Sequence, residues 1–178
     1  MIDRRSFLKR ASVVMAHAAF PQALAAFLAG CSAKHARAPV FFSAEEMRML
    51  GMLVDLILPA TDSPAASAAD TQWFIDLALD ACATTTQKAS MRSGLRALDA
   101  GGFSRLDSIA QSKLLQQRAA ADIALPYDQS FFKILKDYTL TGYFHSEIGA
   151  TQALAYERIP GGYQGDLPLG ADQKAWAT

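Results

Sequence analysis

The sequence contains few of the residues that usually carry chemistry. Its 178 residues include only two cysteines, Cys31 and Cys82, and three histidines. There is no C-x-x-C or C-x-x-C-H motif, so a zinc site and covalently bound haem lack support. Neither H-E-x-x-H nor a calcium-binding loop occurs. The sequence therefore predicts no catalytic residue, no metal site and no cofactor held by this chain.

The shortage of histidine leaves His145 as the only candidate for acid–base chemistry in the folded part. Its neighbour Ser146 would point about 100° away on a helix, so the two do not form a nucleophile–base pair. Asp55 or Asp137 would be needed to complete a triad, and their spacing does not indicate one. A stand-alone enzyme that uses His145 with a carboxylate stays open as an alternative, beside a surface histidine at the start of a helix.

An excess of charge is also missing, since 17 basic and 17 acidic side chains cancel. Residues 1–30 carry +3 and residues 31–178 carry −3. The second part has no basic stripe for phosphates, which argues against nucleic-acid binding. Asp76 and Asp80 lie four residues apart, a pattern more typical of a solvated helix face than of a metal site.

The positive charge lies in an N-terminal prefix that resembles a twin-arginine export signal. Arg4 and Arg5 are followed by Ser6, Phe7 and Leu8, and Asp3 stands where such signals more often have Ser or Thr. Residues 11–30 lack Asp, Glu, Lys and Arg but are only moderately apolar. They fit the central region of an export signal better than a permanent membrane helix. Residues 1–30 are therefore predicted to be a signal peptide.

Cys31 follows Leu28-Ala29-Gly30, which resembles the lipobox of bacterial lipoproteins. Small residues admit the peptide to the signal peptidase, and the thiol is the nucleophile for the thioether bond to lipid. Simple cleavage near Ala26 or Gly30, or an uncleaved anchor, are the alternatives. Lipidation predicts a periplasmic, membrane-attached protein in which residues 31–42 form the tether.

The remaining chain lacks the alternation of Val and Ile typical of strands, so we predict an all-α domain of five to six helices over residues 43–166. Ser43 and Glu46 form a predicted capping box, with Phe42 and Met47 as a hydrophobic staple, and Pro59 ends this first helix. Further helices are predicted at residues 71–84, 86–99, 107–122, 129–142 and 146–154.

Caps and buried faces follow from the same pattern. Asp70 and Asp128 are predicted to cap the helices that they precede. One helix carries Trp73, Phe74, Leu77 and Ala81 on one face, and another is predicted to turn Ile109, Leu114 and Leu115 inward. The Gly/Pro-rich C-terminal segment is predicted to be irregular, and residues 167–178 a flexible tail.

Adjacent aromatic pairs and Cys82 have two interpretations each. The pairs Trp73-Phe74, Phe131-Phe132 and Tyr143-Phe144 cannot point both rings at one core from a single helix. Either the helices are buried on two sides, or one ring of each pair faces a partner. Cys82 is a buried structural thiol, or it forms an intermolecular bridge or a reactive site.

The order of several motifs resembles the family of gluconate 2-dehydrogenase subunit 3. The resemblance covers about residues 42–166. It is carried by Leu53-Val-Asp55-Leu-Ile-Leu-Pro59-Ala-Thr-Asp62-Ser-Pro64, by Trp73-Phe74-Ile75-Asp76, by Phe131-Phe132, by Thr141-Gly142-Tyr143-Phe144-His145-Ser146-Glu147-Ile-Gly149, and by Tyr156 and Pro160-Gly-Gly-Tyr163-Gln-Gly165.

The resemblance implies an accessory small subunit that pairs with a large FAD-containing dehydrogenase of the glucose–methanol–choline type. Such a partner oxidises a sugar, sugar acid or polyol, and a cytochrome c often accepts the electrons. The small subunit usually carries the export signal for both chains and is needed for maturation of its partner. Partner contacts are expected at Trp73, Phe74, Tyr143, Phe144, Tyr156 and Tyr163, with residues 142–166 as an extended arm. A lipoprotein that binds an unrelated partner is the alternative.

Overall fold

The computed structural model describes residues 37–157, 159, 161–162, 166, 168, 170–171 and 173–177. A helical domain spans residues 39–178. Its α-helices are α2 (Ala44–Ile57), α3 (Thr71–Cys82), α4 (Thr85–Ala100), α5 (Ser108–Asp122) and α6 (Phe131–Phe144). Short 3₁₀-helices, η1 (Ala66–Ala69), η2 (Phe103–Arg105) and η3 (Tyr127–Gln129), connect them, and a π-helical turn, η4 (Gly149–Ala153), follows. The all-α prediction is confirmed, since the described residues contain no strand.

Helix α2 begins and ends as its sequence predicts. The Ser43 hydroxyl accepts the Glu46 amide at 3.2 Å, and the Glu46 carboxylate accepts the Ser43 amide at 2.8 Å. Helix α2 ends at Ile57, two residues before Pro59. Proline has no backbone N–H, so it cannot continue the hydrogen bonds of the helix. The side of α2 that carries Met47, Leu50 and Val54 is buried. The capping box thus fixes the residue at which α2 begins, and the side of α2 with these three residues packs in the core.

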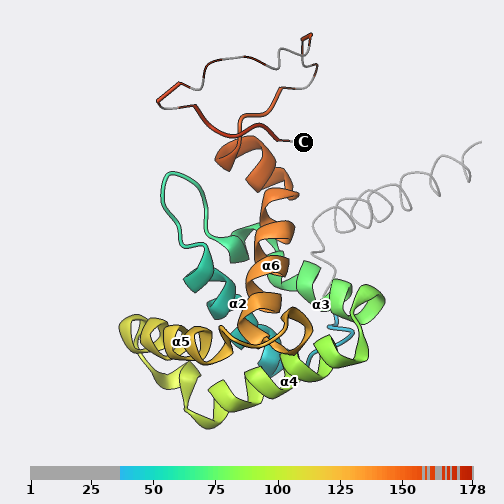
Figure 1. Ribbon diagram of the computed structural model, residues 1–178, viewed down its shortest axis with the longest axis vertical. Coiled ribbons are helices and arrows are strands. Elements are labelled where there is room, and N and C mark those ends of the chain that lie inside the picture. Colours follow the sequence, from blue (N-terminus) through green and yellow to red (C-terminus); the bar gives the residue numbers. More distant parts are fainter. Residues whose placement is uncertain are drawn as a thin grey trace, which may run out of the picture. The chain divides into compact units, whose positions relative to one another are not determined.

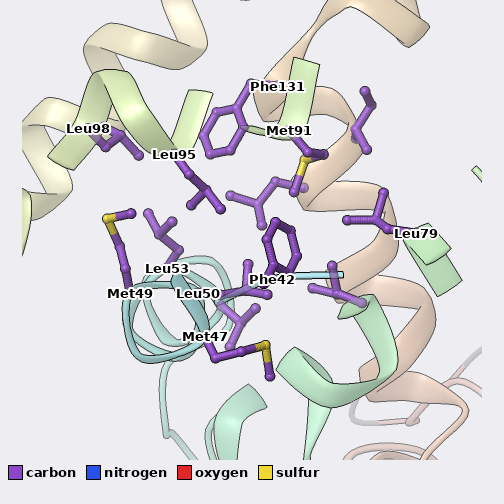
Figure 2. Packing of buried hydrophobic residues seen from close by; sticks show 14 of the residues in the cluster. Phe42, Met47, Met49, Leu50, Leu53, Leu79, Met91, Leu95, Leu98 and Phe131 are labelled. Carbon is purple, nitrogen blue, oxygen red and sulfur yellow. The ribbon is translucent and has the colours of Figure 1, made fainter. Parts of the chain in front are cut away.

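Helix α6 is the central element of the domain, and α2, α3, α4 and α5 all pack against it (Figure 1). Helix α6 is buried on more than one side. Its side chains that are almost inaccessible to water include Phe131, Ile134, Leu135 and Tyr143. Figure 2 shows Phe131 and Phe42 among aliphatic and methionine side chains of the surrounding helices. Burial of such side chains contributes roughly 1.5–3 kcal/mol each.

The structure shows which side of α3 is buried and corrects part of the inward face predicted for α5. Helix α3 buries Ile75 and Leu79, whereas Phe74 is 38% and Leu77 61% exposed. Helix α3 is apolar on two sides, so hydrophobicity alone could not indicate which side packs. In α5, Leu115 is buried as predicted, but Ile109 is 80% exposed.

Two predicted caps are also corrected. Asp70 precedes α3 in a left-handed conformation (φ 57°), and its side chain makes no capping hydrogen bond. The N-cap of α6 is Ser130, not Asp128, and its hydroxyl accepts the Lys133 amide. The buried Asp122 at the end of α5 accepts the Phe132 amide at 2.9 Å, so a neighbouring helix supplies part of the cap.

The C-terminal segment departs from the predicted extended arm. Residues 142–144 belong to α6 and residues 149–153 to η4, so the arm cannot begin at residue 142. Ala155 pairs with Trp176 in an isolated parallel bridge, in which the Ala155 amide donates to the Ala175 carbonyl. The Lys174 ammonium donates to the Gln152 carbonyl at 2.7 Å. Part of the predicted tail therefore returns to the end of the helical domain (Figure 1).

Within the described residues, no helix has both the length and the hydrophobicity required to cross a membrane.

Candidate partner-binding site

Helix α3 packs closely on α6 at Gly142, where two of the sequence blocks come together. The ring of Phe74, from α3, lies so close to this glycine that a Cβ built there would be 2.5 Å from a ring carbon. Any larger residue at position 142 would displace Phe74. The Phe74 ring also lies 6.5 Å from the Tyr138 ring, centroid to centroid. The Trp73-Phe74 and Thr141–Phe144 blocks therefore pack against each other.

Tyr143 joins α6 to the loop that follows α2. Its hydroxyl donates to the Pro64 carbonyl at 2.7 Å and lies 3.0 Å from the Ser63 hydroxyl. The side chain is only 2% exposed. Tyr143 is therefore a core residue that fixes the loop, and it is not part of the exposed surface.

Phe144 lies half-buried beside Tyr143, with the two rings edge to face at 5.3 Å. It lines a shallow hollow of about 360 Å³ together with Leu58, Pro59, Gln152 and Lys174. The hollow lies between the loop after α2, the end of α6, the end of η4 and Lys174, so its lining comes from parts of the chain about 80 or more residues apart. Asp62 and Lys174 are the charged residues of its lining.

An apolar face remains exposed on α3. We call it the α3 face and define it by Phe74, Leu77, Ala81 and Cys82, with the half-buried Tyr138 of α6 at its edge. Burial raises the pKa of Tyr138, with smaller contributions from Cys82 and Asp137, so its hydroxyl stays protonated at neutral pH. The Cys82 thiol is free and exposed, which corrects the interpretation as a buried structural cysteine. Trp73 is half-buried against the core and does not belong to the α3 face.

Asp76, on the opposite side of α3, binds the backbone of a distant segment, which its place in the sequence does not indicate. It is 2% exposed and accepts three successive backbone amides, those of Val40, Phe41 and Phe42, at 2.7, 3.0 and 2.8 Å. The Arg92 guanidinium of α4 donates to the Phe41 carbonyl at 2.8 Å and stacks on the Phe41 ring at 4.4 Å. These contacts hold the chain where it enters the domain. The prediction of a solvated Asp76–Asp80 face is therefore wrong for Asp76.

Asp76→Asn should lower the free energy of unfolding by about 3 kcal/mol, because hydrogen bonds to a buried carboxylate are strong and an amide cannot replace them all. Urea unfolding of residues 31–178 measures this. Asp80→Asn is the matched control: the residue lies one turn away and is exposed, so its effect should stay within about 0.5 kcal/mol. Equal urea midpoints for the two variants would contradict the role assigned to Asp76.

The structure does not assemble the triad considered for His145. The nearest hydrogen-bonding partner of its Nδ1 is the Thr141 carbonyl at 2.9 Å. Asp55 instead accepts the amide and hydroxyl of Ser67, both at 2.7 Å. Asp137 accepts the Tyr127 hydroxyl at 2.6 Å, and burial and this hydrogen bond raise the pKa of Tyr127. Each carboxylate is thus occupied in holding a loop.

Several predicted site residues lie outside the described residues. They are Arg4, Arg5, Phe7 and Leu8 of the export signal, Cys31, and Tyr163. Tyr156 is described and is 58% exposed, close to the bridge between Ala155 and Trp176. Among the described residues, no group of three or more His, Cys, Asp or Glu side chains could hold a metal ion.

These features define a small all-α protein with an apolar face that its own core does not cover and with carboxylates committed to loop contacts. The sequence pattern of the family described as "Gluconate 2-dehydrogenase subunit 3" matches residues 44–161, about two thirds of the chain. The chain belongs to this family. A subunit implies a complex with a larger catalytic subunit. Comparison with curated proteins and comparison with solved structures each gave no match.

Proposed function

We propose that the chain is the accessory subunit of a periplasmic FAD-dependent dehydrogenase of the glucose–methanol–choline type. The large subunit would hold FAD and oxidise a sugar, sugar acid or polyol. The small subunit would escort the folded partner through twin-arginine export and then stabilise it and anchor it. A cytochrome c would accept the electrons.

The exposed α3 face is the observation that supports this proposal. It lies on a protein whose family is named as a subunit. Phe74 and Leu77 leave much of their apolar area in water, and fixed apolar side chains of this kind are typical anchors of protein interfaces. The face lies next to Gly142 and Tyr138, so its shape is set by close helix packing. Purification of the chain from its own host tests the proposal, because a flavoprotein should co-purify with it.

The proposed export route fits the distribution of charge and of small residues in the N-terminal sequence. Arg4 and Arg5 precede an uncharged run, and the run ends at the lipobox-like segment before Cys31. The twin-arginine pathway carries folded proteins, so a chain without its own signal can cross as the partner of a chain that has one. The cargo would then be a flavoprotein that must acquire FAD before export.

Cys31→Ala should leave the complex exported but change how it is anchored, because no thioether bond to lipid can form. Each buried methylene of an acyl chain contributes about 0.8 kcal/mol, and several chains on one cysteine anchor a protein firmly. Fractionation of the periplasm and mass spectrometry of the mature N-terminus measure the change. An unmodified N-terminus at another residue in the wild-type protein would rule out the lipid anchor while leaving the proposed partner unaffected.

A further inference from the structure

Four arginines line one open groove between α2 and α4. The groove has a volume of about 930 Å³ and an apolar floor formed by Met49, Met52 and Leu95. Its basic residues are Arg48, Arg92, Arg96 and Arg105. They are four of the 13 basic residues in a mature chain whose net charge is −3. With Glu45, Glu46 and Asp99 also in its lining, the groove has four positive and three negative side chains, a net charge of +1, whereas residues 31–178 as a whole carry −3.

The groove has three acidic residues against four arginines, and two of the three already have hydrogen-bonding or ionic partners. Glu45 lies 3.4 Å from Arg48, and both are well exposed. Glu46 accepts the Ser43 amide in the capping box. Asp99 is the third acidic residue of the lining. Within the described residues, neither Arg96 nor Arg105 forms an ion pair, so both guanidinium groups are available to an external anion.

The groove adjoins the point at which the chain enters the domain. Ser43 and Arg92 line it, and Arg92 also binds the Phe41 carbonyl. Asp76 holds residues 40–42 from the other side. The entry point therefore has a fixed position at one end of the arginine groove.

The sequence before this point limits its distance from Cys31. Nine residues lead from Cys31 to Val40, which at full extension span about 30 Å. This segment contains Lys34 and Arg37 and no acidic residue. Basic residues next to a membrane anchor favour binding to anionic lipids.

We propose that the arginine groove binds the phosphate headgroups of anionic phospholipids at the membrane surface. The orientation depends on the proposed lipidation of Cys31, which would bring the entry point and its groove to the membrane. Guanidinium groups pair with phosphate oxygens through two parallel hydrogen bonds. The groove would then orient the complex, with the α3 face left for the flavoprotein.

Vesicle binding of the unlipidated mature chain, residues 31–178 with Cys31→Ser, tests the groove separately from the anchor. Vesicles of phosphatidylglycerol and phosphatidylcholine are compared with vesicles of phosphatidylcholine alone. Arg96→Gln with Arg105→Gln should lower partitioning onto the anionic vesicles roughly 10- to 30-fold, since each basic residue near such a surface contributes several-fold. Lys113→Gln with Lys136→Gln removes the same charge from exposed positions on α5 and α6 and should change binding less than threefold.

Equal losses for the two pairs would show a general charge effect and overturn the site, as would a wild-type chain that ignores anionic vesicles. If the arginine pair instead loses the flavoprotein in a pull-down, the groove is part of the protein interface and the membrane proposal is wrong. A wild-type chain that captures no flavoprotein would contradict the proposed function but not the vesicle result.

Discussion

Replacing Arg4 and Arg5 by lysine should abolish export of this chain and of its flavoprotein partner together. In the proposed twin-arginine signal, the export receptor would read Arg4 and Arg5 as a pair. Lysine keeps the charge but not the planar group that binds through two parallel hydrogen bonds. If the partner has no signal of its own, it crosses only while bound to this chain. Immunoblots of periplasmic and cytoplasmic fractions should show both chains retained in the cytoplasm.

Arg10→Lys provides the control for this experiment. It makes the same substitution in the same prefix, five residues after the pair, and should leave export unchanged. A partner that reaches the periplasm at its normal level while this chain is retained would eliminate the escort role. Retention of neither chain would show that residues 1–30 are not a twin-arginine signal.

Leu77→Glu should weaken the complex by at least 100-fold. Leu77 is 61% exposed at the centre of the α3 face, so a glutamate there costs the isolated domain little. In the complex, the same glutamate would be buried against an apolar partner without a counter-charge. Truncation of a central anchor alone commonly costs about 2–4 kcal/mol, which corresponds to roughly 30- to 1,000-fold in affinity.

Ile109→Glu is the matched control, because Ile109 is also an exposed aliphatic residue, 80% accessible, on α5. Both variants should keep the helical circular dichroism signal and the urea midpoint of the wild type. Only Leu77→Glu should lose the partner in co-purification. Equal retention of the partner by both variants would show that the α3 face is not the interface.

The helix boundaries could be predicted because local chemistry determines them. The reciprocal hydrogen bonds of Ser43 and Glu46, and the proline after α2, act within a few residues of the chain. The cap of α6 could not be predicted in the same way. Asp122 reaches the Phe132 amide from the preceding helix, and such a contact exists only after α5 and α6 have packed.

The orientation of α3 required the tertiary structure. Phe74 and Leu77 are as apolar as Ile75 and Leu79, so the sequence offers two candidate faces. Asp76 determines which face is buried, because its carboxylate accepts hydrogen bonds from the three amides of residues 40–42 inside the domain. An acidic residue inside an apolar stretch was the available signal. Its partners are backbone groups more than 30 residues away, which no spacing rule identifies.

A pull-down from the native host tests the proposal that this chain is the accessory subunit of a flavin dehydrogenase. The chain would carry an affinity tag after Thr178, and the captured material would be examined by absorption spectroscopy and mass spectrometry. We expect a yellow complex that contains one larger flavoprotein of the glucose–methanol–choline type, oxidises a sugar, sugar acid or polyol, and is lost with Leu77→Glu. Capture of the chain alone, or with a partner that contains no flavin, would contradict the proposed function.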